Sequence, residues 1–166
     1  LPRGFRTEIN LEATEWILEV SAALKRGFVI TIDYGNSSSG LYSQSAGAGT
    51  LVCYHRHQVS PSPYAWIGEQ DITSHVNFSA LEHWGRRGGL EYCGFTSQSR
   101  FLQGLGLTRR LQQLELASRQ GRLPDLSFQQ LYTLLVDMGN KFKVLIQRKG
   151  VGRKFLSGLQ FSQHLA

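Results

Sequence analysis

The chain is poor in cysteine, in charged residues and in long apolar runs, and each shortage excludes a class of protein. Two of the 166 residues are cysteine, Cys53 and Cys93, and they lack the spacing of a metal or redox motif. No apolar run approaches the ~20 residues that cross a bilayer. Charged residues make up 18% of the chain, below the roughly one quarter that is typical. We therefore expect a globular protein of a reducing compartment, with part of its surface normally covered.

Several catalytic motifs are missing as well. There is no Gly-x-Ser-x-Gly segment, no Gly-x-Gly-x-x-Gly after a strand and no phosphate-binding loop, so nucleophilic catalysis and phosphate binding have little support. The first residues, 1–4, contain neither a starting Met nor a signal peptide. We interpret the chain as trimmed or as a fragment.

Positive charge is in excess, with a net charge of +6 and a pI near 9.6. Such an excess indicates either a patch for an acidic partner or nucleic acid, or a solvated strand edge and tail. No RNA-binding signature with interleaved aromatic residues accompanies it, so nucleic acid is not the expected partner. The cations that gather toward the C-terminus are Lys141, Lys143, Arg148, Lys149, Arg153 and Lys154.

The apolar pattern predicts alternating helices and strands. Apolar residues make up 41% of the chain, enough for a core. The order suits an α/β sheet with a late antiparallel strand. The predicted helices are 11–26, 78–87, 97–105, 108–120 and 127–138, and the predicted strands are 28–32, 50–57, 90–95 and 142–148.

The first helix and strand carry clear local signals. Asn10 is a plausible N-cap, and Gly27 stops the helix. Residues 28–32 are apolar on both faces, which is typical of a buried parallel strand. Asp33 follows directly, where open α/β sheets bind ligands. Alternatively, Asp33 only caps a turn before Gly35.

The middle of the chain is polar. Residues 36–49 form a Ser/Gly-rich stretch that we interpret as a flexible loop. His55 and His57 share a face if 50–57 is one strand. These histidines, with Asp71 and His75, are ligand types without diagnostic spacing, so we expect no metal.

A polar substrate contact is the preferred interpretation of the same segment. Asp33, Asp71, Thr73 and His75 are suited to surround a polar group, with His75 moving a proton and a carboxylate holding a guanidinium. Alternatively, Asp71 and Thr73 cap the loop before the helix at 78, for which Asn77 is the expected N-cap.

A set of short motifs, in order, resembles the MidA-like family, closest to its bacterial, cyanobacterial-looking members. The resemblance spans about Gly4 to Gly150. Its mitochondrial relatives act as complex I assembly factors. The motifs are Ile32-Asp33-Tyr34-Gly35, Gly49-Thr50-Leu51 with His57, Gly68, Asp71-Ile72-Thr73-Ser74-His75-Val76-Asn77-Phe78, Thr96-Ser97-Gln98, Phe101-Leu102 and Gly106-Leu107.

The resemblance implies a Rossmann-like class I methyltransferase that uses S-adenosylmethionine. In the mitochondrial relatives the methyl acceptor is a protein arginine. The strand at 28–32 would be the fifth of the sheet, and those at 90 and 142 the closing pair, the last antiparallel. Residues 1–166 would form a single partial domain, the C-terminal half of the fold, with a helical insertion at 97–138 and a basic tail at 150–166.

The chain also departs from the family's pattern. The glycine-rich loop, the acidic ribose partner and the Asn-Glu-x-x-Asp segment have no counterpart here, and Asn36 and Asn77 replace the usual residues. No donor-binding residues can therefore be named. The residues that carry over are assigned to the acceptor side, with Asp71 and His75 as catalytic and with Asp33, Tyr34, His57 and Thr73 as substrate-binding candidates.

We therefore expect the acceptor-side portion of a protein arginine methyltransferase, inactive alone. The alternative is a non-catalytic binding or assembly module derived from a truncated methyltransferase. The expected partner is a protein substrate, without nucleic acid or membrane, and homo-oligomers are possible. The expected location is the bacterial cytoplasm, or the mitochondrion if the protein is eukaryotic.

Overall fold

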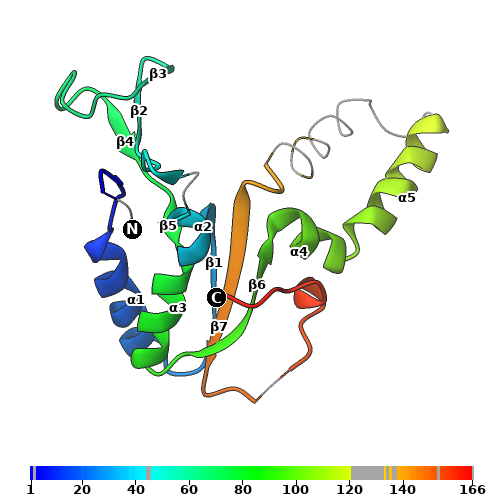
Figure 1. The fold of residues 1–166 in the computed structure, drawn as a ribbon. Helices are drawn as coiled ribbons and strands as arrows, with labels where there is room; N and C mark the ends of the chain where they lie inside the picture. Colours follow the sequence, from blue (N-terminus) through cyan, green and yellow to red (C-terminus); the bar gives the residue numbers. More distant parts are fainter. Residues whose placement is uncertain are drawn as a thin grey trace.

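A mixed four-stranded sheet forms the centre of the computed structural model, which describes residues 1, 3–43, 46–120, 133, 135, 138–152 and 154–165. The strand order is β5-β1-β7-β6 (Figure 1). β1 (Gly27–Asn36) and β6 (Glu91–Ser97) both pair antiparallel with β7 (Phe142–Lys149). β5 (Val76–Asn77) runs parallel to the end of β1. The predicted α/β sheet with a late antiparallel strand is confirmed.

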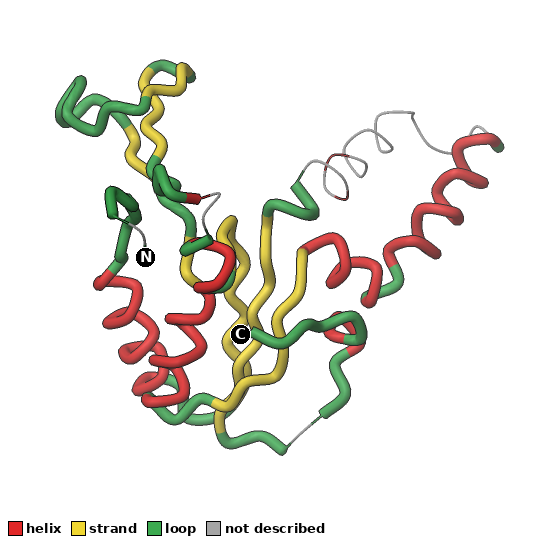
Figure 2. Tube along the Cα trace, in the orientation of Figure 1, coloured by secondary structure: helices red, strands yellow, loops and turns green. Residues whose placement is uncertain are grey.

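Helices α1 (Leu11–Ala23) and α3 (Phe78–Arg87) cover one face of this sheet (Figures 1 and 2). Each begins at a predicted cap, because Asn10 Oδ1 accepts from Ala13 N and Asn77 Oδ1 from Ala80 N, both at 3.0 Å. Each fully buried large apolar side chain contributes about 1.5–3 kcal/mol. The buried core on this face comprises Ile17, Phe78, Leu81, Leu90, Phe95 and Leu145.

Among the described residues, the cover of the other face lies over β6 and β7. There α4 (Gln98–Gly104) and the short helix η3 (Ser157–Leu159) pack on a cluster around Val144 and Ile146. The C-terminal segment folds back on β6, where Gln163 N donates to Phe95 O at 2.8 Å. α5 (Leu107–Arg119) confirms the predicted helix at 108–120. The helix predicted at 127–138 lies outside the described residues.

β1 corrects the prediction of a strand buried on both faces. Phe28, Ile30 and Ile32 are 37%, 55% and 48% exposed. They lie on the face where α4 and η3 cover only β6 and β7. On the edge away from β7, β1 pairs with β5 only at Gly35 and Asn36. A continuous apolar run needs a cover on both faces, and the described residues supply it on one.

A small three-stranded sheet protrudes beyond the carboxyl end of β1 (Figure 1). This arm consists of β2 (Val52–His55), β3 (Gln58–Ser60) and β4 (Asp71–Thr73), in the order β3-β2-β4. The predicted strand 50–57 is thus wrong beyond His55. Arg56 and His57 form a tight turn with φ of 47° and 65°, so His55 and His57 do not share a strand face. The expected loop 36–49 contains a short helix, α2 (Ser38–Leu41).

Gly35 lets β5 approach β1. A Cβ at Gly35 would collide with the backbone carbonyl of Val76, so the Gly35→Ala variant must push the two strands apart. We expect it to lose about 1–3 kcal/mol of unfolding free energy, measured by urea denaturation. Gly152→Ala is the control, because its Cβ would meet no atom within 4 Å. Equal stability of the two variants would contradict this role for Gly35.

The open side of β1 predicts self-association. Unpaired strand edges with exposed apolar residues promote pairing between chains, and a lysine there opposes it. We expect the chain to associate with rising concentration, and Ile30→Lys to shift association to higher concentration, as measured by light scattering after gel filtration. Leu105→Lys adds the same charge at another exposed apolar site, 56% exposed. A chain that stays monomeric throughout, or an equal effect of both variants, would count against this interpretation.

Candidate functional site

A pocket of about 500 Å³ lies where the carboxyl end of β1 meets the base of the arm and the start of β7. This size is typical of small-ligand sites. Its position, beyond the end of a strand, is where open α/β sheets bind ligands. The lining residues are Tyr34, Gly35, Asn36, Thr50, Val52, Tyr54, Thr73, His75, Asn140, Lys141, Phe142 and Lys143.

An aromatic cluster forms part of the pocket wall. The Tyr34 ring contacts the edge of His75, with centroids 5.6 Å apart, and the edge of Phe142, at 5.9 Å. The interplanar angles of 71° and 84° are those of favourable edge-to-face pairs. Packing from both sides restricts the Tyr34 ring and places the imidazole of His75 beside it.

Two threonines make hydrogen bonds within the arm and at its base. Thr73 Oγ1 donates to Val52 O at 3.1 Å, across the β2–β4 ladder. His75 N donates to Thr50 Oγ1 at 2.9 Å. Thr73 therefore bonds to the backbone of a neighbouring strand, and not to its own loop as the capping alternative supposed. These bonds fix the backbone on both sides of His75.

Glu8 holds the same junction from a distant part of the chain. Its carboxylate accepts hydrogen bonds from Thr50 N at 2.8 Å, from Thr50 Oγ1 at 3.1 Å and from Leu51 N at 3.1 Å. Burial acts to raise the pKa of Glu8, but these hydrogen bonds outweigh it and hold the pKa below its ordinary value. Sequence reasoning missed Glu8, because no local pattern links it to Thr50.

The structure brings some of the predicted site residues together and leaves others apart. Tyr34, Thr73 and His75 line the pocket. Asp33 accepts a hydrogen bond from the backbone of Tyr34 at 2.8 Å and is absent from the lining. Asp71 lies exposed at the start of β4, and His57 lies exposed in the β2–β3 turn.

Sequence reasoning also missed residues at the start of β7. Asn140, Phe142 and Lys143 line the pocket, whereas the sequence predicted only a strand at 142–148 and a basic character for this segment. Lys143 Nζ donates to Asn140 O at 2.6 Å. Burial lowers the pKa of Lys143, and the nearby charge of Arg100 lowers it further. With Lys141 also in the lining, this side of the pocket carries basic side chains.

No metal cluster or membrane-spanning helix is found among the described residues. In that part of the chain no three His, Cys, Asp or Glu side chains come together as metal ligands. None of its helices is long and apolar enough to cross a bilayer. His55, one of the histidines considered as a ligand, stacks on Trp66 with centroids 4.7 Å apart.

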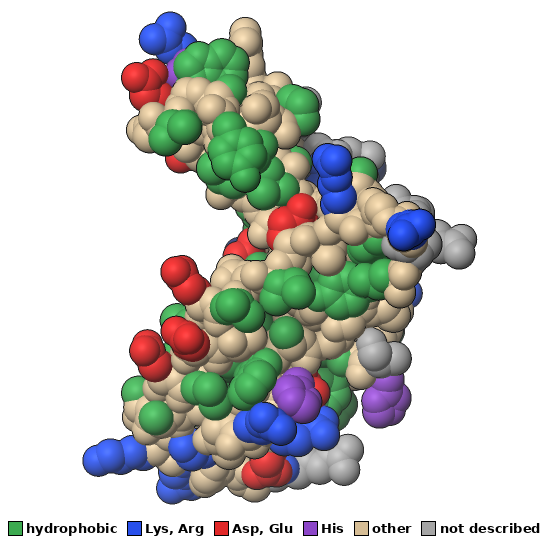
Figure 3. All heavy atoms as spheres, turned by 60° about the vertical axis from the view of Figure 1, so that its left-hand side comes forward, with side chains coloured by type: hydrophobic (Ala, Val, Ile, Leu, Met, Phe, Trp, Pro, Cys, Tyr) green, Lys and Arg blue, Asp and Glu red, His purple; other side chains and the backbone are tan. Residues whose placement is uncertain are grey.

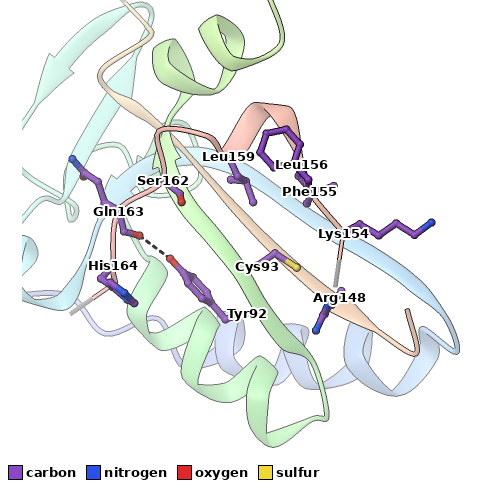
Figure 4. Close-up of a pocket in the computed structure, with 10 residues that line it drawn as sticks. All are labelled: Tyr92, Cys93, Arg148, Lys154, Phe155, Leu156, Leu159, Ser162, Gln163 and His164. Atoms are coloured by element: carbon purple, nitrogen blue, oxygen red, sulfur yellow. Dashed lines mark hydrogen bonds between the residues drawn. The ribbon is translucent and has the colours of Figure 1, made fainter. Parts of the chain in front are cut away.

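A larger hollow, of about 720 Å³, lies between β6, β7 and the C-terminal segment (Figure 4). Cys93 lies on its floor, and Tyr92 Oη donates to Gln163 O at 2.8 Å across one side. Burial raises the pKa of Cys93, so its thiol is a poor nucleophile. None of the predicted site residues lines this hollow.

The pocket residues do not fit a complete S-adenosylmethionine molecule. Its described lining contains no carboxylate to accept the ribose hydroxyl groups. Protein atoms occupy the space next to the glycines at this edge. A Cβ at Gly35 would meet β5, one at Gly40 would meet Asn36, and one at Gly49 would meet Glu8. At these three glycines no free cradle is left for a donor.

The lowered pKa of Glu8 makes the stability of the fold depend on pH. Because its pKa is lowered on folding, the stabilisation from Glu8 is present at neutral pH and is lost as pH falls through the lowered pKa. We expect Glu8→Gln to cost about 1 kcal/mol at pH 7, since the group is only partly buried, and clearly less at about pH 3. Urea denaturation at both pH values measures this. Glu69→Gln, at an exposed position, should change little at either pH. A loss of stability in Glu8→Gln that does not depend on pH would contradict the ionic role.

Residues 1–96 match a family described as “putative S-adenosyl-L-methionine-dependent methyltransferase”. A search of curated proteins found no match. A crystal structure from Burkholderia thailandensis, bound to S-adenosyl-homocysteine, is 34% identical with a TM-score of 0.84, and the match covers 97% of this chain and 41% of that one. A native crystal structure of an uncharacterized protein from the same organism is 34% identical with a TM-score of 0.82, covering 94% and 41%.

The chain thus spans about two fifths of the length of the solved structures it matches. The expected methyltransferase fold and S-adenosylmethionine as the cofactor of the family are confirmed. The family match covers more than half of the chain, and the first structural match covers nearly all of it. The chain belongs to this family of S-adenosyl-L-methionine-dependent methyltransferases.

Proposed function

We propose that this chain is the acceptor-side part of a MidA-like methyltransferase that modifies an arginine of a protein substrate. The observation that carries the proposal is the pocket lined by Tyr34, Thr73 and His75 at the carboxyl edge of a methyltransferase sheet. The choice of arginine rests on the MidA-like resemblance of the motifs around these residues.

The pocket residues have chemistry that suits this reaction. Methyl transfer to nitrogen needs an acceptor that is aligned and has lost its proton. His75 is held beside Tyr34 in the pocket, and an imidazole can take a proton near neutral pH. Asp71 lies two residues before Thr73 in β4 and therefore on the same strand face. We assign His75 to proton transfer and Asp71 to holding the guanidinium at the outer rim.

The same proposal makes this chain inactive alone. It forms a single partial domain with an acceptor pocket, and its residues do not fit the methyl donor. The uncovered face of β1, with Phe28, Ile30 and Ile32 exposed, is suited to pack against a donor-binding part. Activity then requires that part.

A non-catalytic binding module is the second candidate. Its support is the apolar surface of the arm, where hydrophobic side chains gather (Figure 3). Single exposed apolar residues are normal, whereas a group of them marks interaction sites. The exposed residues of the arm and its loops include Tyr54, Val59, Tyr64, Trp66, Ile67 and Ile72.

The methyltransferase proposal is tested in a chimera. This chain is joined to the part of the Burkholderia thailandensis relative that it does not cover, and methyl transfer from labelled S-adenosylmethionine to arginine-containing proteins is measured. We expect transfer by the chimera and none by this chain alone. His75→Ala should lower turnover by about a hundredfold, the usual loss for a general base.

Glu115→Ala is the matched control, because Glu115 lies on α5, away from the pocket lining, and forms an ion pair with the exposed Arg119. It should leave turnover unchanged. Full turnover of the His75→Ala chimera would remove His75 from the mechanism. A folded chimera that binds proteins through the arm but transfers no methyl group would favour the binding module.

A further inference from the structure

A second hollow continues the acceptor pocket along the edge of the sheet. It has a volume of about 220 Å³ and shares Asn36, Asn140 and Lys143 with the pocket. Its other lining residues include Ser97 and Arg100, at the end of β6 and the start of α4. The two hollows together form one groove across the carboxyl ends of β1 and β6 and the start of β7.

Three cations line this groove: Arg100, Lys141 and Lys143. Among the described residues that line either hollow, none is Asp or Glu. Arg100 and Lys143 form no ion pair with any residue that the structure describes. Lys143 donates instead to the carbonyl of Asn140. Other basic residues nearby in sequence are paired, since Arg148 contacts Glu91 at 2.5 Å and Lys149 donates to Ser21 O.

The positive charges of Arg100 and Lys143 repel each other. Arg100 lies close enough for its charge to lower the pKa of Lys143, in addition to the effect of burial. An anion placed between them would relieve this repulsion and replace lost solvent contacts. A guanidinium that entered the pocket without such an anion would meet net positive charge, which disfavours its binding.

We infer that this groove docks acidic side chains that flank the modified residue of the protein substrate. The inference rests on the proposed function for the identity of the modified residue. Because the two hollows share residues, a target side chain in the pocket and acidic neighbours in the groove can bind at once. The acidic residues neutralise Arg100, Lys141 and Lys143 and allow the cationic acceptor to enter.

A polypeptide suits the groove better than a nucleic acid. Single-stranded nucleic acids bind to exposed aromatic faces along a basic track. Here the Tyr34 and Phe142 rings pack edge to face against each other and are half-buried. Among the described lining residues this leaves Tyr54 as the exposed tyrosine ring, and one ring does not make a stacking track. The cations lie at two adjoining hollows of about 500 and 220 Å³, and not along an extended track.

Fluorescence anisotropy with the whole chain tests the inference. The probes are a labelled peptide with one arginine flanked by glutamates, the same peptide with glutamines, and a labelled single-stranded oligonucleotide. We expect the glutamate peptide to bind most tightly, and more weakly as salt rises. The Arg100→Gln, Lys141→Gln double variant changes two exposed side chains and should weaken its binding by about tenfold.

Two controls separate a local site from general charge. Lys25→Gln with Arg26→Gln removes the same charge at the opposite end of β1 and should leave binding unchanged. Lys143→Arg keeps the charge and should bind the glutamate peptide, whereas Lys143→Gln should not. Circular dichroism checks that each variant is folded. If Lys143→Gln does not fold, the Arg100→Gln, Lys141→Gln double variant decides the result.

Equal binding of the glutamate and glutamine peptides, equal loss in both double variants, or preference for the oligonucleotide would each overturn the inference. Peptide binding needs no methyl donor, so it is measured independently of turnover. Binding of the glutamate peptide without methylation by the chimera would support the basic groove as a docking site and remove the methyltransferase proposal. Methylation by the chimera without a preference for the glutamate peptide would support the methyltransferase proposal and remove the inference of acidic docking.

Discussion

The antiparallel ladder between β1 and β7 is the contact on which the rest of the structure depends. Eight residue pairs join the strands, from Gly27 with Lys149 to Tyr34 with Phe142, although the partners are more than a hundred residues apart in the chain. Such long-range pairing must overcome a large loop-closure entropy. It forms the floor on which α1 and α3 pack, and it places Phe142 against Tyr34. Without this ladder neither the pocket nor the groove exists.

The β1–β7 ladder also places the basic residues near the C-terminus in two groups, one at each end of β7. Arg148 and Lys149, at one end of β7, are held by Glu91 and by the carbonyl of Ser21. Lys141 and Lys143, at the other end, face the acceptor pocket. The sequence left open whether this charge was a solvated strand edge or a partner surface. The structure pairs the cations at one end of β7 with protein groups and places those at the other end along a pocket.

The pocket lies at a junction of three parts that are far apart in the sequence. Glu8 precedes α1, Thr50 precedes the arm, and Lys143 begins β7, yet all three contribute to one edge of the sheet. The hydrogen bonds of Glu8 and Thr50 position the arm, and the aromatic contacts of Tyr34 position His75. A site built in this way is stable only when the sheet is formed, which ties the proposed chemistry to the packing of the whole domain.

The sequence by itself determined the local elements. The caps Asn10 and Asn77 and the helix predicted at 108–120 follow from interactions over three or four residues, which a sequence displays directly. The family resemblance grouped Asp33, Tyr34, His57, Asp71, Thr73 and His75, and of these only Tyr34, Thr73 and His75 line the pocket. Only the tertiary structure decided that the turn at Arg56 and His57 separates the two histidines, that β1 has one open face, that Glu8 holds Thr50, and that Asp33 lies outside the pocket lining. These features depend on backbone turns and on contacts between distant segments, whose energies no local pattern of residues encodes.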